Sequence, residues 1–275
     1  MALEKYSNQP SVHDFFVNPI RHQSVVEEYF NVDENMEYLA DENLAKYLNE
    51  KAITEMIQVN SEITRILNKF QIRVKINMNI LNNLVKNHLS ETRKIALGIA
   101  NHLPQEYKSE VNHKALAEAT SLHDLAKAII PEDILNKAGA LNEKEREIME
   151  EHATLSYELL KTTDLSPETL NLIKHHHHDP HKSGYPHIEE GFKSDINLQI
   201  LSIADIYSAL REKRSYKAEM SVEESLAVIN KETKQGKFST HVYNALVRYT
   251  NEMALTKRKP KWKIFDVKSV NSLSA

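Results

Sequence analysis

Apolar residues recur along the chain at intervals of three and four positions, the spacing that gathers them on one face of an α-helix. The segments with this spacing are residues 41–70, 91–103, 114–130, 142–161, 166–178, 197–210 and 221–233. Helix start signals agree with it: Asn142 has a glutamate three positions on, and Ser166 is followed by Pro167. Pro131 is expected to end the helix before it, because proline cannot continue the backbone hydrogen bonds. With only five glycines in 275 residues, the pattern predicts an all-α protein.

The composition disfavours some binding partners and excludes some metal ligands. The chain has no run of eighteen apolar residues, so no transmembrane helix is expected, and residues 1–14 lack the basic and apolar parts of a signal peptide. A net charge of −4 disfavours binding to a nucleic-acid polymer. The chain contains no cysteine, which excludes disulfides and thiolate ligands. These features predict a cytoplasmic protein without membrane or nucleic-acid partners, in which nitrogen and oxygen atoms hold any metal.

The distribution of unusual residues suggests three parts. Residues 1–72 are expected to form a short acidic helical segment, residues 73–250 a helical bundle domain, and residues 251–275 a basic tail. The N-terminal segment is compatible with an adaptor, a homodimer interface or a binding site for a protein partner. The sequence leaves these three roles open.

Several charged and polar residues stand inside apolar helical runs. Asp124 follows His123 in one such run, and Asp205 lies in another. A buried carboxylate without a partner is costly, so each aspartate needs a cation nearby. Lys127 lies on the same side of a helix as Asp124 and is one candidate, while a metal ion is another. His152 has apolar residues one turn before and one turn after it, so it is also expected to point inward.

Six of the fourteen histidines fall within residues 175–187. His176 and His177 continue the apolar stripe of the preceding helix, so they are expected to point into the bundle. His175 and His178 are expected on its flanks. For each histidine alone, a hydrogen-bonded core residue is the competing interpretation; the whole set favours a metal centre.

Residues 121–218 contain, in order, stretches that resemble the HD-GYP family, metal-dependent phosphodiesterases that hydrolyse the bacterial second messenger cyclic di-GMP. HDLAKAIIPEDILNKAGALNEKEREIMEEH (123–152) is similar to the family's stretch from HD-x-G-K through I-P-x-x-I-L-x-K-x-G-x-L to the next histidine. HHHHDPHKSGYP (175–186) is similar to its H-H-E…G-Y-P block, and ILSIADIYSALREKRSYKA (200–218) to I-x-x-I-A-D-x-Y-D-A-L…R-x-Y-x-x-A. His88 resembles the family's first histidine, in H-S-x-R-V. The resemblance covers residues 88 to about 250.

The resemblance implies an HD-type helical bundle that binds two divalent metal ions, iron or manganese. The implied ligands are His88, His123, Asp124, His152, His176, His177 and Asp205, with Asp124 bridging both ions. Lys127 would act with Asp124 in catalysis, by stabilising a phosphate oxygen or assisting the leaving oxygen. Arg214 and Lys217 match positions that contact the substrate phosphates, and Tyr185 of the GYP motif would shape the guanine pocket.

The implied activity is hydrolysis of cyclic di-GMP to linear pGpG, and onward to GMP, at a binuclear centre. The family's glutamate that often binds a third metal is Leu84 here, which favours two ions over three. Ser208 stands for the second aspartate of D-x-Y-D-A-L, and the residues before SGYP also differ from the family's. These departures keep three alternatives open: another cyclic dinucleotide as substrate, a receptor or scaffold without catalysis, and an HD phosphohydrolase for another nucleotide.

Overall fold

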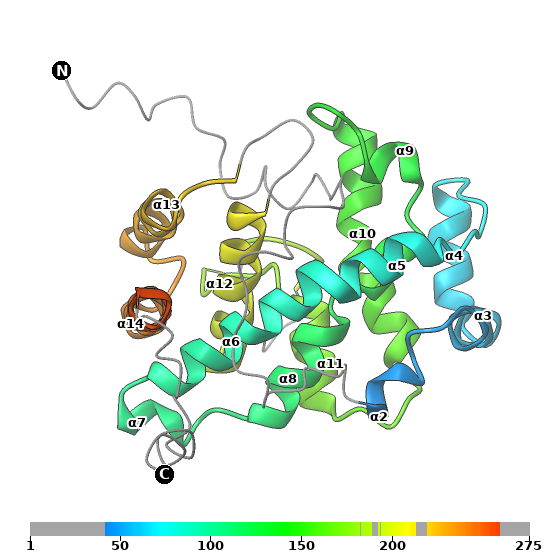
Figure 1. Ribbon diagram of the computed structural model, residues 1–275. Coiled ribbons are helices and arrows are strands. Elements are labelled where there is room, and N and C mark those ends of the chain that lie inside the picture. Colours follow the sequence, from blue (N-terminus) through cyan, green and yellow to red (C-terminus); the bar gives the residue numbers. More distant parts are fainter. Residues whose placement is uncertain (1–41, 182, 189–191, 193, 213–218, 259–275) are drawn as a thin grey trace, which may run out of the picture.

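The computed structural model describes residues 42–181, 183–188, 192, 194–212 and 219–258. Within these ranges every regular element is helical and no strand is present, which confirms the predicted all-α class (Figure 1). The elements are α2 (Glu42–Ala45), α3 (Glu50–Gln58), α4 (Ser61–Lys69), α5 (Met78–Leu84), the π-helical turn η3 (Val85–Leu89), α6 (Ser90–His102), α7 (Gln105–Lys108), α8 (His113–Leu122), the 3₁₀ turn η4 (Leu125–Ala128), α9 (Glu132–Leu135), α10 (Glu143–Leu160), α11 (Pro167–His175), α12 (Ile196–Arg211), α13 (Val222–Lys234) and α14 (Thr240–Arg258). None of the helices in the described ranges is long and apolar enough to cross a bilayer. The predicted phosphate contacts Arg214 and Lys217 lie outside the described residues.

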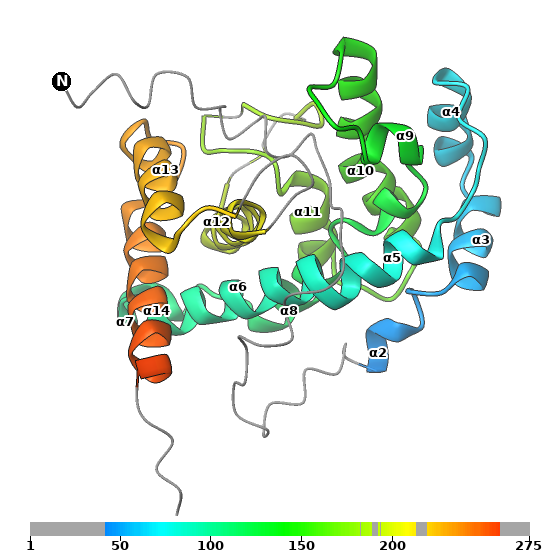
Figure 2. The ribbon, with the colours of Figure 1, turned by 45° about the horizontal axis from the view of Figure 1, so that its top comes forward.

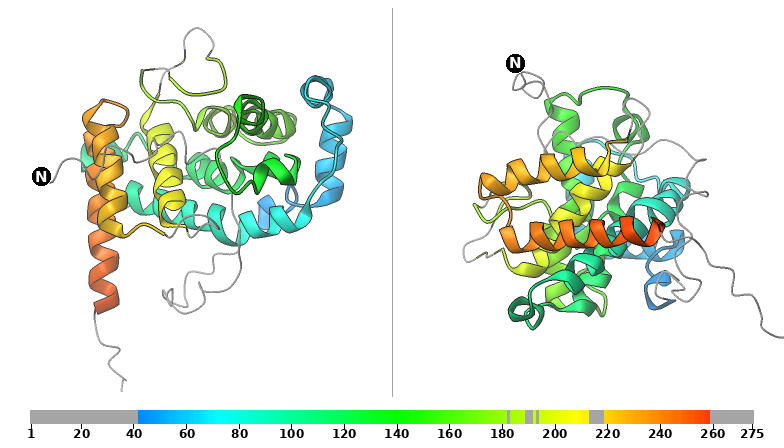
Figure 3. Two further views of the ribbon diagram at one scale, coloured as in Figure 1. Left: turned by 90° about the horizontal axis from the view of Figure 1, so that it is seen from above. Right: turned by 60° about the vertical axis from the view of Figure 1, so that its left-hand side comes forward.

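One long helical stretch organises the bundle. α5, η3 and α6 follow one another without a break, and Figure 2 shows them as a single rod across the molecule. α8, α12 and α14 pack on α6, while α3 and α4 pack on α10. Figure 3 shows α13 and α14 side by side at the end of the bundle opposite α3 and α4. α11 contacts α8, α10 and α12, so the chain segment that follows it starts from the interior of the bundle.

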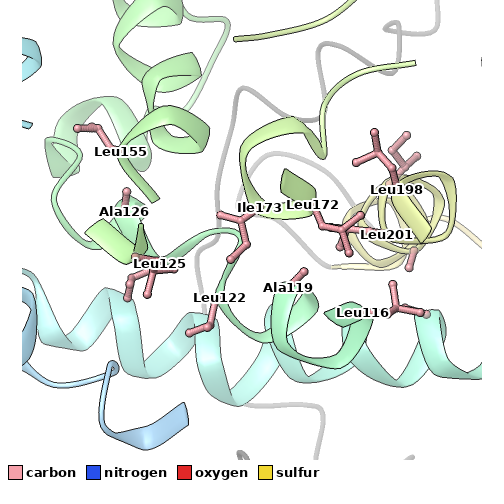
Figure 4. Packing of buried hydrophobic residues seen from close by; sticks show 14 of the residues in the cluster. Leu116, Ala119, Leu122, Leu125, Ala126, Leu155, Leu172, Ile173, Leu198 and Leu201 are labelled. Atoms are coloured by element: carbon pink, nitrogen blue, oxygen red, sulfur yellow. The ribbon is translucent and has the colours of Figure 1, made fainter. Parts of the chain in front are cut away.

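Aliphatic side chains from α8, η4, α10, α11 and α12 fill that interior (Figure 4). Leu116 and Leu122 of α8 are fully buried, as are Leu172 and Ile173 of α11 and Leu201 of α12. Truncating one such leucine to alanine typically costs about 2–5 kcal/mol. The same hydrophobic cluster continues into α3 and α4, so the described part of the N-terminal segment shares one core with the bundle.

The helix start signals act as the sequence predicts. Asn142 accepts a hydrogen bond from the backbone N–H of Glu145, whose carboxylate accepts one from the N–H of Asn142. Ser166 caps α11, with Pro167 in its first turn. Such caps satisfy N–H groups that a helix leaves unpaired, and each contributes about 1 kcal/mol.

The predicted single helix over residues 114–130 is wrong. α8 ends at Leu122, and a 3₁₀ turn replaces the continuation. Bonds to distant residues explain the break: the N–H of Ala126 donates to Ser156 Oγ at 3.0 Å, and the carbonyl of Ala128 accepts from the N–H of Asn77 at 2.8 Å. These tertiary hydrogen bonds take backbone groups that a continuing α-helix would use itself. The His-Asp pair therefore stands on a turn.

The predicted helical segment 41–70 divides into three short helices, because the side chains of Asn49 and Asn60 cap new starts. Asn60 also ties α4 to α10: its Nδ2 donates to the backbone oxygen of Glu158 at 2.7 Å and to the carboxylate at 2.9 Å. At the other end, α14 continues past residue 250 to Arg258. The division of the chain at residues 72 and 250 stays a prediction.

Candidate metal centre

Histidines and aspartates from separate parts of the sequence meet in the interior of the bundle. They are His88 on η3, His123 and Asp124 after α8, His152 on α10, His176 and His177 after α11, and Asp205 on α12. The structure thus brings together all of the residues that the sequence predicted as metal ligands. Apart from His177, which stands at the edge, each is at most 5 % exposed.

Asp124 lies at the centre of this group. Its Oδ1 is 3.3 Å from His152 Nε2 and 4.0 Å from His176 Nε2. Its Oδ2 is 3.5 Å from His88 Nε2 and 3.6 Å from His123 Nε2. Because each oxygen faces a different pair of imidazoles, this carboxylate is placed between two groups of ligand atoms.

Two positions for an ion follow from these distances. We call the first the Asp205 position, formed by His88, His123 and Asp205; here Asp205 Oδ1 is 2.9 Å from His88 Nε2 and 3.7 Å from His123 Nε2. We call the second the triple-histidine position, formed by His152, His176 and His177. In it, His152 Nε2 is 3.4 Å from His176 Nε2 and 3.0 Å from His177 Nε2. In each group the ligand atoms lie within 4.8 Å of one another.

Local backbone geometry orients three of the imidazoles. The Nδ1 atoms of His123, His152 and His176 lie 3.2, 2.6 and 2.7 Å from the carbonyl oxygens of Thr120, Met149 and Ile173, each three residues earlier. A carbonyl only accepts hydrogen bonds, so in the neutral imidazole Nδ1 carries the hydrogen. The lone pair of Nε2 then points toward Asp124, as a metal ligand requires.

A π-helical turn, and not a regular α-helix, positions His88 in the centre. The π-helical turn η3 joins α5 to α6 within one continuous rod, and His88 is its fourth residue. Single π-turns within α-helices often occur at functional sites. The Nδ1 of His88 contacts Ser208 Oγ at 3.4 Å, where His123, His152 and His176 have a carbonyl.

The electrostatics of the centre favour the metal-binding forms of Asp124 and of three histidines, His152, His176 and His177. Burial and the nearby Lys127 ammonium lower the pKa of His152 to about 4, and burial also lowers the pKa of His176 and His177. Burial alone would raise the pKa of Asp124, but Lys127 and the surrounding histidines hold it well below its usual range. Neutral imidazoles and ionised carboxylates are the ligating forms.

The carboxylates of Asp124 and Asp205 change the pKa of His123, and Asp124 forms an ion pair with Lys127. Burial alone would lower the pKa of His123, but Asp124 and Asp205 raise it above its ordinary value. Lys127, which is 8 % exposed, places its ammonium 2.6 Å from Asp124 Oδ2. A cation is therefore already held beside the carboxylate that the ligands surround.

These residues fit a divalent metal. Among the described residues, neither His123 Nε2 nor Asp124 Oδ1 has a hydrogen-bond partner, although both atoms are fully buried. Buried polar atoms without partners are costly, and an ion between the converging nitrogen and oxygen atoms would satisfy them. A donor set of imidazoles and carboxylates without thiolates suits manganese, iron or zinc.

The loop before Tyr185 forms a wall of the centre. The Tyr185 ring lies 4.4 Å from that of His177 and 5.9 Å from that of His152, measured between centroids. Asp179 shapes the loop, since its Oδ1 accepts from the N–H of His181 at 2.8 Å and of Ser183 at 3.1 Å. The predicted tyrosine of the GYP motif thus stands against two of the predicted ligands.

His175 and His178 differ from their prediction as flank residues. Both are buried, with their Nδ1 atoms 3.3 Å apart and both rings against Phe192. α11 ends at His175 with His176 as its C-cap, so helical periodicity does not reach His178.

Two serines of α12 support the ligands and were not predicted to do so. Ser202 Oγ donates to the backbone oxygen of His176 at 2.6 Å, and Ser208 is the contact of His88. With Asp205 they lie three residues apart on one helical face. Polar residues at this spacing in an otherwise apolar run are a signal that could have identified them.

Comparison with known proteins agrees with this geometry. The family model described as HD domain matches residues 75–242. The chain is also 31 % identical over 77 residues to a protein of Vibrio cholerae serotype O1 (strain ATCC 39315 / El Tor Inaba N16961) named 3'3'-cGAMP-specific phosphodiesterase 1. That similarity covers 28 % of this chain and 18 % of the relative's length.

Proposed function

This chain belongs to the HD domain family, and we propose that it is a metal-dependent phosphodiesterase that opens cyclic dinucleotides. The observation that carries the proposal is the position of Asp124, whose two oxygens face two separate groups of ligand atoms. A carboxylate placed in this way would hold a pair of divalent ions. The ions, held by the predicted ligands, would supply Lewis-acid activation of the attacking water and offset the charge of the phosphate oxygens.

The protein's own residues have distinct roles in this proposal. The attacking water loses a proton as its oxygen bonds to phosphorus, the bond to the 3′ oxygen breaks, and the leaving oxygen takes up a proton. Lys127, anchored at 2.6 Å from Asp124, is placed to stabilise a phosphate oxygen or to assist the leaving oxygen. Burial raises the pKa of Tyr185 well above its ordinary value, so its hydroxyl stays protonated and its ring offers an apolar wall to a purine base.

The substrate that we propose is cyclic di-GMP, converted to linear pGpG and onward to GMP. The resemblance of residues 123–152 and 175–186 to HD-GYP motifs supports this choice. The relative from Vibrio cholerae bears a name that specifies 3'3'-cGAMP, so this cyclic dinucleotide is the substrate to compare. Iron or manganese is the proposed metal, since the centre offers imidazole and carboxylate ligands.

The test is hydrolysis by full-length protein purified without oxygen and loaded with Fe²⁺ or Mn²⁺. Cyclic di-GMP and 3'3'-cGAMP are supplied separately, and the linear products are separated by chromatography. Asp124→Ala is expected to abolish turnover, because it removes the carboxylate shared by both positions. Asp164→Ala is the matched control, since this exposed aspartate pairs with Lys46 at 2.9 Å, outside the centre. Binding of either dinucleotide without turnover would instead establish a receptor.

A further inference from the structure

We propose that the two metal positions have unequal affinities and that the Asp205 position fills last. This inference rests on the proposed function, because it assumes that the centre binds two divalent ions. The reason lies in the residues that surround the ligands. They differ between the two positions at His88 and at the two oxygens of Asp124.

Ser208 is a weak support for His88. A ligating histidine is held in place, and made more basic, by the acceptor that takes its second ring hydrogen. His152 and His176 have backbone carbonyls in that role, at 2.6 and 2.7 Å. His88 has the neutral Ser208 hydroxyl at 3.4 Å, beyond the usual length of a good hydrogen bond. His88 is therefore less firmly oriented than His152 and His176, and it belongs to the Asp205 position.

Lys127 also weakens the binding of an ion at the Asp205 position. Its ammonium lies 2.6 Å from Asp124 Oδ2, the oxygen that faces His88 and His123. An ion entering the Asp205 position has to share this oxygen with the ammonium. Asp124 Oδ1, which faces the triple-histidine position, has no hydrogen-bond partner among the described residues. An ion at the triple-histidine position would therefore not compete with a hydrogen bond for Asp124 Oδ1.

Together these contacts make Ser208 a positioning residue for His88. At low metal concentration the protein would hold one ion at the triple-histidine position. The second ion would enter only at higher concentration, so the binuclear form would follow metal supply. An aspartate at 208 would extend a charged acceptor about one bond length further than the serine hydroxyl, toward His88 Nδ1.

The experiment is a titration of chelator-stripped full-length protein with Mn²⁺, with free Mn²⁺ counted by electron paramagnetic resonance. Wild-type protein is expected to bind two ions in two steps whose dissociation constants differ by about ten-fold or more. His88→Ala should keep the first step and lose the second. Ser208→Asp should tighten the second step by about ten-fold or more and leave the first unchanged.

Ser208→Asn is the matched control, because it has the size of aspartate without its charge, and its second step should stay close to that of wild type. Lys127→Met gives an independent test if Ser208→Asp fails to fold in circular dichroism melts. It frees Asp124 Oδ2, so it should also tighten the second step.

The outcomes separate this inference from the proposed function. Two steps of equal affinity in the wild type, or loss of the first step in His88→Ala, would overturn the order of filling. A second step that tightens equally in Ser208→Asp and Ser208→Asn would overturn the role of Ser208. Failure of the stripped wild-type protein to bind any Mn²⁺ would refute the binuclear centre itself.

Discussion

The substitution Gly184→Ala tests how closely the loop before Tyr185 packs against the backbone of His177. Gly184 has a φ of +114°, a conformation that residues with a side chain rarely adopt. A Cβ built on it would lie 2.0 Å from the carbonyl oxygen of His177 and 2.9 Å from the carbonyl carbon. Both atoms belong to the backbone, so no side-chain rotation relieves the overlap. The change Gly184→Ala therefore acts on a predicted metal ligand as well as on the loop.

The expected cost follows from the two strains. A carbon and an oxygen normally lie no nearer than about 3.3 Å, so the loop or His177 must move by more than about 1 Å. The unfavourable φ costs about 1–3 kcal/mol, and forcing an extra carbon into a packed site about 1–3 kcal/mol. Gly184→Ala should thus lower the free energy of unfolding by about 2–6 kcal/mol. It should also weaken Mn²⁺ binding at the triple-histidine position, because His177 is displaced.

Urea denaturation of the metal-free protein measures the first effect, and Mn²⁺ titration the second. Gly139→Ala is the matched control, because a Cβ there meets nothing within 4 Å. That variant should be neutral or more stable by about 0.4–1 kcal/mol, since alanine restricts the unfolded chain. Equal stability of the two variants would refute the reasoning about the close approach of Gly184 to His177.

Two further predictions concern stability. In the metal-free protein, the free energy of unfolding should fall as the pH drops from about 6.5 to about 4. In this range His152 is protonated in the unfolded chain but stays neutral when it is buried in the folded protein, so protonation favours the unfolded state. His176 and His177 act in the same direction and His123, with its raised pKa, opposes them, so a flat profile in urea denaturation at successive pH values would contradict this balance. Asn60→Ala should cost about 2–3 kcal/mol, since it removes a helix cap and the bonds to Glu158. Asn49→Ala, which loses a cap alone, should cost about 1 kcal/mol, and equal losses in thermal unfolding would count against the link to α10.

Local signals in the sequence were sufficient for much of the helical framework. Asn142 and Ser166 cap helices where predicted, because capping depends on residues within one turn of each other. The sequence also predicted a candidate ligand set, since Asp124 and Asp205 in apolar runs require partners and the resemblance to family motifs implied the other members. Periodicity predicted the inward direction of His152 and His176, because both follow regular helical turns.

Contacts between distant residues decided the rest. The chain turns at His123 because Ser156 and Asn77 take backbone groups of the next residues, and no local pattern contains those partners. The burial of His175 and His178 depends in the same way on Phe192, which packs against them.

The assignment of each Asp124 oxygen to one group of histidines also required the folded chain. The weak support of His88 by Ser208 joins residues 120 positions apart. Sequence by itself determined which residue types could bind a metal and which helices would carry His152 and Asp205, because those properties are local. Tertiary structure decided their distances and their outer partners, because side chains from η3, α10 and α12 meet only after the helices have packed.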